Sequence, residues 1–183
     1  MNFSPSVVIT DEAMDIMLTA GLAELPYETG GILAGFRTED QVVVTRAAVV
    51  PDADSSRREY QLHKRSATEE LARLKIGTSA VVGFVGDWHT HPADVPPSSI
   101  DVTSLEFVAR SAGDLVALVV LPFHQGEPRP VHVRVGRQLG SARLNRRARV
   151  TIHHAPLTIT SVKAEDLERS AEFALKSKET PAT

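Results

Sequence analysis

The chain has 183 residues, a formal net charge of −3 and an isoelectric point near 6.2, which fits one domain with a short appendage and gives no overall attraction to nucleic acid or anionic membranes. Hydrophobic residues make up 42% and charged residues 23%, as in folded proteins and unlike disordered or fibrous ones. The absence of cysteine excludes disulfides, thiolate metal ligands and a catalytic thiol.

The first helix is predicted to begin at a cap formed by Thr10 or Asp11 and to run to about residue 22. Its apolar residues recur at helical spacing, which predicts a face buried in the core. These residues are Met14, Met17, Leu18 and Leu22.

The predicted strands are short apolar runs bounded by turn residues. They cover residues 7–9, 32–36, 41–50, 60–62, 81–88, 115–123 and 131–135. The run 115–123 is the most apolar and is expected to be central, and residues 38–40 are expected to form a hairpin connection. Strands that alternate with helices predict an α/β sandwich with a mixed sheet.

Two more helices separate the later strands. Ser66 is predicted to begin one of them, because Glu69 completes the spacing of a capping box. Either Ser98 or Ser99 is predicted to open the other, which continues to about residue 110.

Residues 137–183 differ in character from the rest of the chain. Five arginines occur between Arg137 and Arg149 with no acidic residue among them. A strand-like stretch at 150–159 and an amphipathic helix at 162–176 are predicted to follow.

His89 and His91 directly follow the predicted strand 81–88 and are candidate metal ligands. On a strand they project to the same side, about 6.6 Å apart along it, and neutral imidazole is a good zinc ligand. Pro92 ends the strand and opens a stiff, proline-rich loop. Asp101, in the first turn of the next predicted helix, can add a carboxylate. Two His and one carboxylate leave a fourth tetrahedral position for water, which is typical of catalytic zinc.

A hydrolytic zinc site also needs a base that takes up and returns protons. Asp87 is a local candidate, because it shares one strand face with both histidines. Glu28 is a remote candidate in a glycine-rich turn just before a predicted strand. The residues alone leave this choice open.

The string His-Thr-His-Pro at residues 89–92, followed by Ser98 and Asp101 in the spacing Ser-x-x-Asp, resembles the signature of the JAMM (MPN+) zinc metallopeptidases. That family includes the prokaryotic JAB-domain proteins. The segment 28–33, Glu-Thr-Gly-Gly-Ile-Leu, is similar to the glutamate segment of the family. The resemblance implies a deaminase-like three-layer α/β sandwich at residues 1–136. It leaves residues 137–183 as an extension without an indicated role.

The resemblance also implies roles for individual residues. His89, His91 and Asp101 would bind one zinc ion. Glu28 would hydrogen-bond the zinc-bound water and act as base and then as acid, and Ser98 would stabilise the oxyanion. The implied reaction is hydrolysis of a peptide or isopeptide bond, as in deubiquitinases, after the C-terminal Gly-Gly of a ubiquitin-like or sulfur-carrier protein. The connection between Phe123 and Val131 is short, whereas eukaryotic members that cleave ubiquitin carry long insertions there. This difference favours a small bacterial substrate.

Three further residues are candidate contacts for the substrate. Gly30 and Gly31 allow close approach of another backbone, so an extended tail could bind there by strand addition. Trp88 lies between site residues but points to the opposite strand face. Packing in the core is its simpler role, and forming a wall of a substrate groove is the alternative.

Two other functions compete with the protease hypothesis. A non-catalytic MPN-like scaffold is one, although the chain retains all five site residues. A nucleic-acid-associated relative of the same fold is the other, and only the arginine cluster favours it, so nucleic acid is not an expected partner. The oligomeric state stays open, with a homo-oligomer as one option. No apolar run approaches the roughly 20 residues of a membrane helix and no signal peptide opens the chain, so we expect a cytoplasmic protein.

Overall fold

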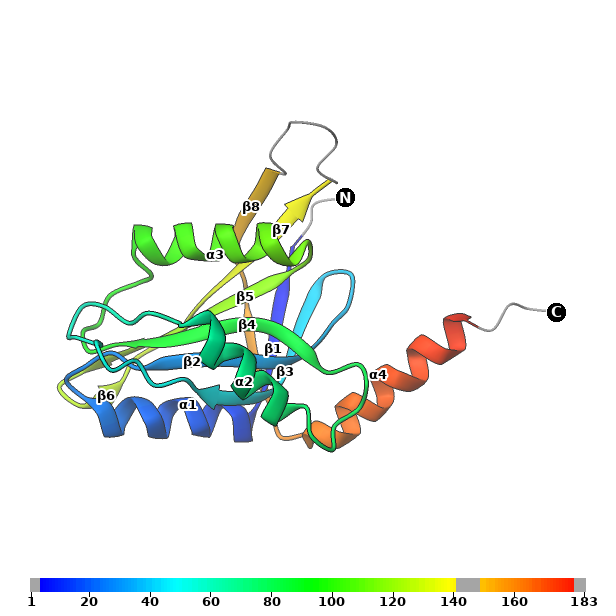
Figure 1. Ribbon diagram of the computed structural model, residues 1–183, viewed down its shortest axis with the longest axis horizontal. Coiled ribbons are helices and arrows are strands. Elements are labelled where there is room, and N and C mark those ends of the chain that lie inside the picture. Colours follow the sequence, from blue (N-terminus) through cyan, green and yellow to red (C-terminus); the bar gives the residue numbers. More distant parts are fainter. Residues whose placement is uncertain (1–3, 141–148, 180–183) are drawn as a thin grey trace.

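The computed structural model describes residues 4–140 and 149–179 and contains a mixed β-sheet flanked by helices (Figure 1). The strands are β1 (Ser6–Thr10), β2 (Gly30–Arg37), β3 (Gln41–Val49), β4 (Gly83–His91), β5 (Val116–His124), β6 (Glu127–Pro128), β7 (His132–Leu139), β8 (Arg149–His154) and β9 (Leu157–Thr160). The helices are α1 (Asp11–Glu24), α2 (Lys64–Leu74), α3 (Ser99–Ala112) and α4 (Ala164–Glu179). The predicted α/β class is confirmed.

The sheet has the strand order β8-β7-β5-β4-β2-β3-β1-β9, with β6 paired to the end of β5. β4 lies between β2, to which it is antiparallel, and β5, to which it is parallel. β8 and β9 stand at opposite ends of this order, although only Ala155 and Pro156 separate them in sequence. The sheet therefore curls until its two ends meet at the segment 149–160. The stretch 150–159, expected as one strand, is divided between two sheet partners.

α1 begins as predicted, because the Thr10 Oγ1 accepts a hydrogen bond from the Ala13 N–H at 3.3 Å. Met14 and Met17 are buried against the sheet. The expectation that Leu22 shares this face is wrong, since its side chain is 46% exposed. Leu22 is eight residues after Met14, which turns it about 80° around the helix.

The two faces of the sheet carry different helices. α1 covers one face. The main core lies between α1 and the sheet and includes Trp88 and Phe123. α3 covers part of the other face, where Leu105 and Ala109 pack on apolar residues of β5. In Figure 1, α1 and α3 accordingly lie on opposite sides of the strands. Within the described residues, no helix combines the length and apolar character needed to cross a membrane.

Two details before β4 differ from the prediction. α2 begins at Lys64 with His63 as its N-cap, and no side chain hydrogen-bonds that cap. The expected capping box of Ser66 and Glu69 is therefore wrong. Residues 60–62 do not form a strand. Instead, the Tyr60 hydroxyl donates to the Val50 carbonyl oxygen at 2.7 Å, which holds this segment against the end of β3.

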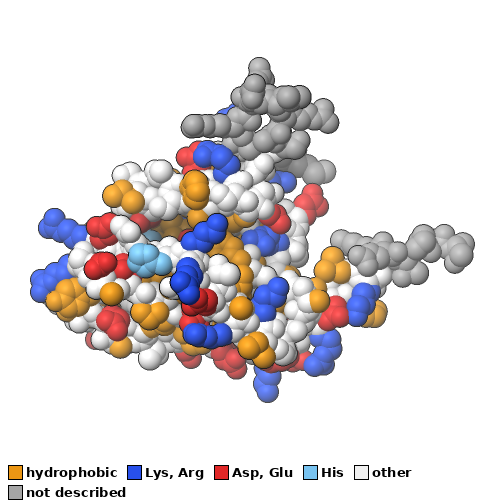
Figure 2. All heavy atoms as spheres, viewed as in Figure 1, with side chains coloured by type: hydrophobic (Ala, Val, Ile, Leu, Met, Phe, Trp, Pro, Cys, Tyr) orange, Lys and Arg blue, Asp and Glu red, His pale blue; other side chains and the backbone are white. Residues whose placement is uncertain are grey.

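The outward face of β4 is left open between the helices. α2 packs on β2 and β3, whereas α3 packs on β5, β7 and β8. Figure 2 shows hydrophobic side chains at the bottom of a hollow beside α3. We call this strip, residues 84–91 of β4 between α2 and α3, the β4 groove.

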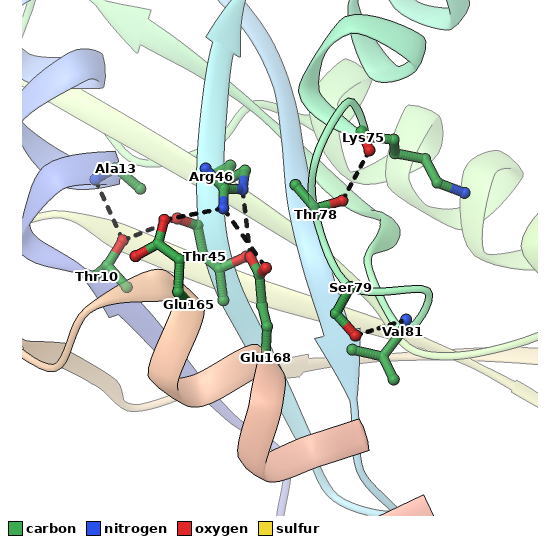
Figure 3. Close-up of polar contacts among 10 residues, drawn as sticks. All are labelled: Thr10, Ala13, Thr45, Arg46, Lys75, Thr78, Ser79, Val81, Glu165 and Glu168. Carbon is green, nitrogen blue, oxygen red and sulfur yellow. Dashed lines mark hydrogen bonds and ion pairs between the residues drawn. The ribbon is translucent and has the colours of Figure 1, made fainter. Parts of the chain in front are cut away.

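Glu168 anchors α4 to β3, and its side chain is almost fully buried (Figure 3). Its carboxylate accepts a hydrogen bond from the Thr45 hydroxyl at 2.8 Å and lies 3.3 Å from the Arg46 Nε. Glu165, which is exposed, also pairs with Arg46, at 3.2 Å. Beyond this anchor the helix projects away from the sheet (Figure 1).

We expect Glu168→Ala to lower the free energy of unfolding by about 1–3 kcal/mol, because it leaves Thr45 and Arg46 without their buried partner. Urea titration followed by circular dichroism measures this change. Glu165→Ala is the matched control and should change stability little, since exposed ion pairs contribute little. Equal losses in the two variants would contradict the anchoring role of Glu168.

Candidate metal centre

His89 and His91 extend from the last residues of β4. In the sheet, His89 is paired with Gly30 of β2 and with Val120 of β5. Both imidazoles project from the same face, and their Nε2 atoms lie 3.1 Å apart. The side chains are 11% and 7% exposed. Strand geometry thus brings two ring nitrogens to one mostly buried point.

Asp101 reaches the same point from the first turn of α3. The Ser98 Oγ accepts from the Asp101 N–H at 3.2 Å, and the Asp101 Oδ2 accepts from the Ser98 N–H at 2.5 Å. This reciprocal capping box fixes the carboxylate. Asp101 Oδ1 lies 3.5 Å from the His89 Nε2, and Oδ2 lies 3.5 Å from the His91 Nε2.

The three side chains fit a tetrahedral zinc ion. Bonds of about 2.0–2.1 Å in that geometry separate the ligand atoms by about 3.3 Å. The two Nε2 atoms are 3.1 Å apart, and each lies 3.5 Å from a different oxygen of Asp101, close to this value. Within the described residues, His89, His91 and Asp101 are the one group of three or more such side chains that could hold a metal.

A backbone contact orients the second histidine. The His91 Nδ1 lies 3.1 Å from the carbonyl oxygen of Val95, in the proline-rich loop. A carbonyl oxygen only accepts, so Nδ1 carries the proton and donates it. The Nε2 lone pair is then left to face the other two ligands, the arrangement that metal-binding histidines usually show.

The electrostatics of the site favour a bound cation. Burial opposes the ionised form of Asp101, but hydrogen bonds with both histidines and with the Ser98 N–H outweigh it and hold the pKa of Asp101 well below its usual range. Burial also lowers the pKa of His91, but hydrogen bonds with Asp101 and Val95 raise it more. The ionised carboxylate beside two imidazoles is a ligand set ready for a divalent metal.

Glu28 lies beside this group, in the turn before β2. Thr29 holds the turn on β4, because the Thr90 N–H donates to the Thr29 carbonyl oxygen at 2.8 Å and the Thr29 N–H donates to the Thr90 hydroxyl at 3.0 Å. Glu28 is 8% exposed. Burial raises the pKa of Glu28 to about 7; His91 lowers it, whereas Asp101 and Glu59 raise it.

The segment 51–62 holds Glu28 from the other side, a role that the sequence did not indicate. The Glu28 N–H donates to the Ser56 carbonyl oxygen at 2.8 Å. Asp52 folds this segment, because its carboxylate accepts from the N–H groups of Asp54 and Gln61 at 3.1 and 2.9 Å. The only signal in the sequence was a polar loop, and its contact with Glu28 depends on tertiary folding.

Asp87, the other candidate base, also lies on the outward face of β4, between Ile32 and Leu118 of the neighbouring strands. Burial, followed by the negative charge of Asp101, raises the pKa of Asp87 to about 7. Glu28, by contrast, is influenced directly by His91.

The three candidate substrate contacts, Gly30, Gly31 and Trp88, lie within strands of the sheet. Trp88 is 1% exposed on the opposite face of β4, where its Nε1 donates to the Ala48 carbonyl oxygen at 3.1 Å. Gly30 and Gly31 belong to β2, whose hydrogen bonds are shared between β3 and β4. No free edge exists there for strand addition. A Cβ at Gly31 would come within 1.8 Å of the Ala48 oxygen, so close packing in the sheet explains this glycine.

The arginine cluster is only partly visible. Three of its members lie outside the described residues; they are Arg143, Arg146 and Arg147. Arg137 belongs to β7, and Arg149 begins β8.

Comparison with known families agrees with this geometry. A profile of the family described as prokaryotic homologs of the JAB domain matches residues 10–136. That stretch contains β2 to β5, all three candidate ligands and Glu28.

Two curated relatives and one solved structure are similar to the chain. The CD-NTase/cGAS isopeptidase of Enterobacter hormaechei is 32% identical over 112 residues, 58% of this chain and 60% of that protein. The protein of the same name from Escherichia coli is 29% identical over 125 residues, 65% of this chain and 78% of that protein. A solution structure from Desulfitobacterium hafniense has a TM-score of 0.58 at 18% identity, over 86% of this chain and 94% of that one. This last likeness concerns the fold alone.

Proposed function

Because this chain belongs to the family of prokaryotic JAB-domain proteins, we propose that it is a zinc-dependent isopeptidase. The observation that carries the proposal is the convergence of His89, His91 and Asp101 at ligand distances, with the buried Glu28 beside them. The name isopeptidase of two relatives supports it. The chain spans only 60% of the length of the first relative, so its substrate is proposed on chemistry.

The proposed reaction is hydrolysis of an amide bond. When bound, zinc would polarise the scissile carbonyl and make the attacking water more acidic. Glu28 accepts a proton from the attacking water and returns it to the leaving amine. The oxygen of the water ends in the new carboxyl group, and the C–N bond breaks.

Ser98 is proposed to stabilise the oxyanion. Its Oγ accepts a hydrogen bond from the Asp101 N–H, which leaves the hydroxyl proton free to be donated. The position at the start of α3, close to the ligand Asp101, suits an oxygen that gains negative charge.

The proposed substrate is a ubiquitin-like or sulfur-carrier protein joined through its C-terminal Gly-Gly. The names of the two relatives suggest conjugates with a CD-NTase or cGAS-like protein as one target. The turn at Gln125 and Gly126, both with positive φ, keeps the β5–β7 connection short and favours a small partner.

The test is cleavage of such a conjugate by the purified, zinc-loaded protein. We expect release of the ubiquitin-like protein with a free Gly-Gly terminus, loss of activity in a chelator and recovery on addition of zinc. A conjugate with Ala-Ala in place of Gly-Gly is the matched control. A folded, zinc-bound protein that cleaves no linear or branched linkage would reject the isopeptidase proposal in favour of a scaffold.

A further inference from the structure

Asp87 carries a carboxyl group that the proposed reaction does not use. It lies in β4 between Ile32 and Leu118, which are 0% and 3% exposed. Within residues 4–140 and 149–179, no side chain forms a hydrogen bond or ion pair with this carboxyl, whose hydrogen-bond partner is its own backbone N–H. The nearby Tyr60 hydroxyl is already donated to the Val50 oxygen. Asp87 is only partly buried, so its carboxyl is accessible to a ligand that would give it a side-chain partner.

The carboxyl faces the β4 groove. The pairing of β4 with β5 runs without a shift from Gly86 to His91, so alternate residues share one face. His89 and His91 meet Asp101 on that face, and Asp87 therefore lies on it too, about 6.6 Å further along the strand. Apolar side chains lie at the bottom of the hollow beside α3 in Figure 2, so Asp87 contributes a carboxyl group to a mostly apolar floor.

Three acidic side chains gather at one end of the groove. Asp87, Asp101 and Glu28 all lie at the end of the groove near the metal centre, and none of them forms an ion pair with a Lys or Arg in the described part of the chain. A bound metal ion would compensate the ligand Asp101. Asp87, two residues from the nearest ligand, would still lack a side-chain partner.

The part of the substrate that fits the groove is its extended tail, an argument that rests on the proposed function. A flexible C-terminal tail can lie along a strip between two helices, whereas a folded domain cannot. An extended chain advances about 3.3 Å per residue. If the scissile carbonyl lies at the ligands, the residues two to three positions before it therefore lie beside Asp87. With Gly-Gly at the last two positions, the third residue has the first side chain able to reach.

We propose that Asp87 is a specificity-determining residue that binds the guanidinium or ammonium group of an Arg or Lys third from the scissile bond. A carboxylate pairs with guanidinium through two parallel hydrogen bonds. Asp87 would thereby select tails with a basic residue before Gly-Gly.

Binding to an inactive protein tests the proposal separately from catalysis. Zinc-loaded Glu28→Gln protein is titrated with two labelled tail peptides that end in Arg-Gly-Gly or Gln-Gly-Gly, linked to a lysine side chain. We expect the Arg peptide to bind about tenfold tighter than the Gln peptide, which is the gain in affinity expected from one charge-assisted hydrogen bond. Adding Asp87→Asn should remove the difference, and adding Asp40→Asn, in the β2–β3 turn, should keep it.

Equal affinity for the two peptides in the Glu28→Gln protein would overturn the proposal without any change at Asp87. A preference that survives Asp87→Asn would overturn it as well. Thermal melting and zinc content show whether that variant keeps its fold. If the Arg preference is present but the wild type cleaves no conjugate, the role of Asp87 stands and the proposed isopeptidase function fails.

Discussion

Replacing Glu28 with Gln should lower kcat by about 10²–10⁴-fold, the usual contribution of a general base, while zinc content and KM change little. Gln keeps the size and the hydrogen-bonding shape of the side chain but cannot accept the proton of the attacking water. Single-turnover cleavage of a Gly-Gly conjugate, with zinc measured on the same sample, is the decisive measurement. Wild-type rates in a zinc-loaded Glu28→Gln protein would remove Glu28 from the mechanism.

The pH dependence of the same reaction has a definite sign. A base must be ionised, so kcat/KM falls as the pH drops through the Glu28 pKa, which burial raises to about 7 in this structure. A bound divalent cation favours the carboxylate, so the loaded enzyme should lose activity at or below pH 7. Glu59→Gln is the matched control. Because the charge of Glu59 raises the Glu28 pKa, this variant should stay active and shift the profile to lower pH.

Replacing His89 with Ala should abolish zinc binding. Loss of a residue that only orients a ligand costs about 10–100-fold in metal affinity, and loss of a ligand itself should cost more than about 100-fold. Elemental analysis of the purified proteins should find about one zinc per wild-type chain, the number that one three-ligand site can hold, and almost none in the variant.

The control for that experiment is His124→Ala, an exposed histidine at the end of β5. It should bind zinc like the wild type. Both variants should show the circular dichroism spectrum of the wild type, because the cluster lies at the ends of β4 and α3 rather than in the main core. Full zinc content in His89→Ala would mean that the metal is held elsewhere, and the hydrolytic proposal would lose its basis.

Local sequence signals were sufficient where one short segment determines the structure. Thr10 and Ser98 cap their helices through their own hydroxyl groups, and the interval between His89 and His91 places both on one strand face. Ser66 is not the cap because the helix already begins at Lys64, with His63 as its N-cap. The segment 51–62 leads directly into that start. That start depends on tertiary contacts, which no short pattern encodes.

Long-range relations were beyond the residues alone. Glu28 is 61 positions from His89, and only the pairing of Gly30 with His89 across β2 and β4 makes them neighbours. The residues alone left Glu28 as one of two candidate bases, and the family resemblance favoured it over Asp87. The sequence likewise did not indicate that residues 149–160 form two strands, one paired with β7 and one with β1. One continuous segment there lies opposite Arg134 of β7 and Val7 of β1.

The curl of the sheet has a consequence for its edges. β7 and β1 would each present an unpaired row of backbone N–H and C=O groups without the segment 149–160, which pairs with both. Exposed rows of this kind join molecules edge to edge into aggregates. A shortened protein that stops at residue 136 keeps the candidate ligands and exchanges the edge strands β8 and β9 for β7 and β1. The C-terminal residues therefore determine which strands form both edges of the sheet, independently of any part they take in chemistry.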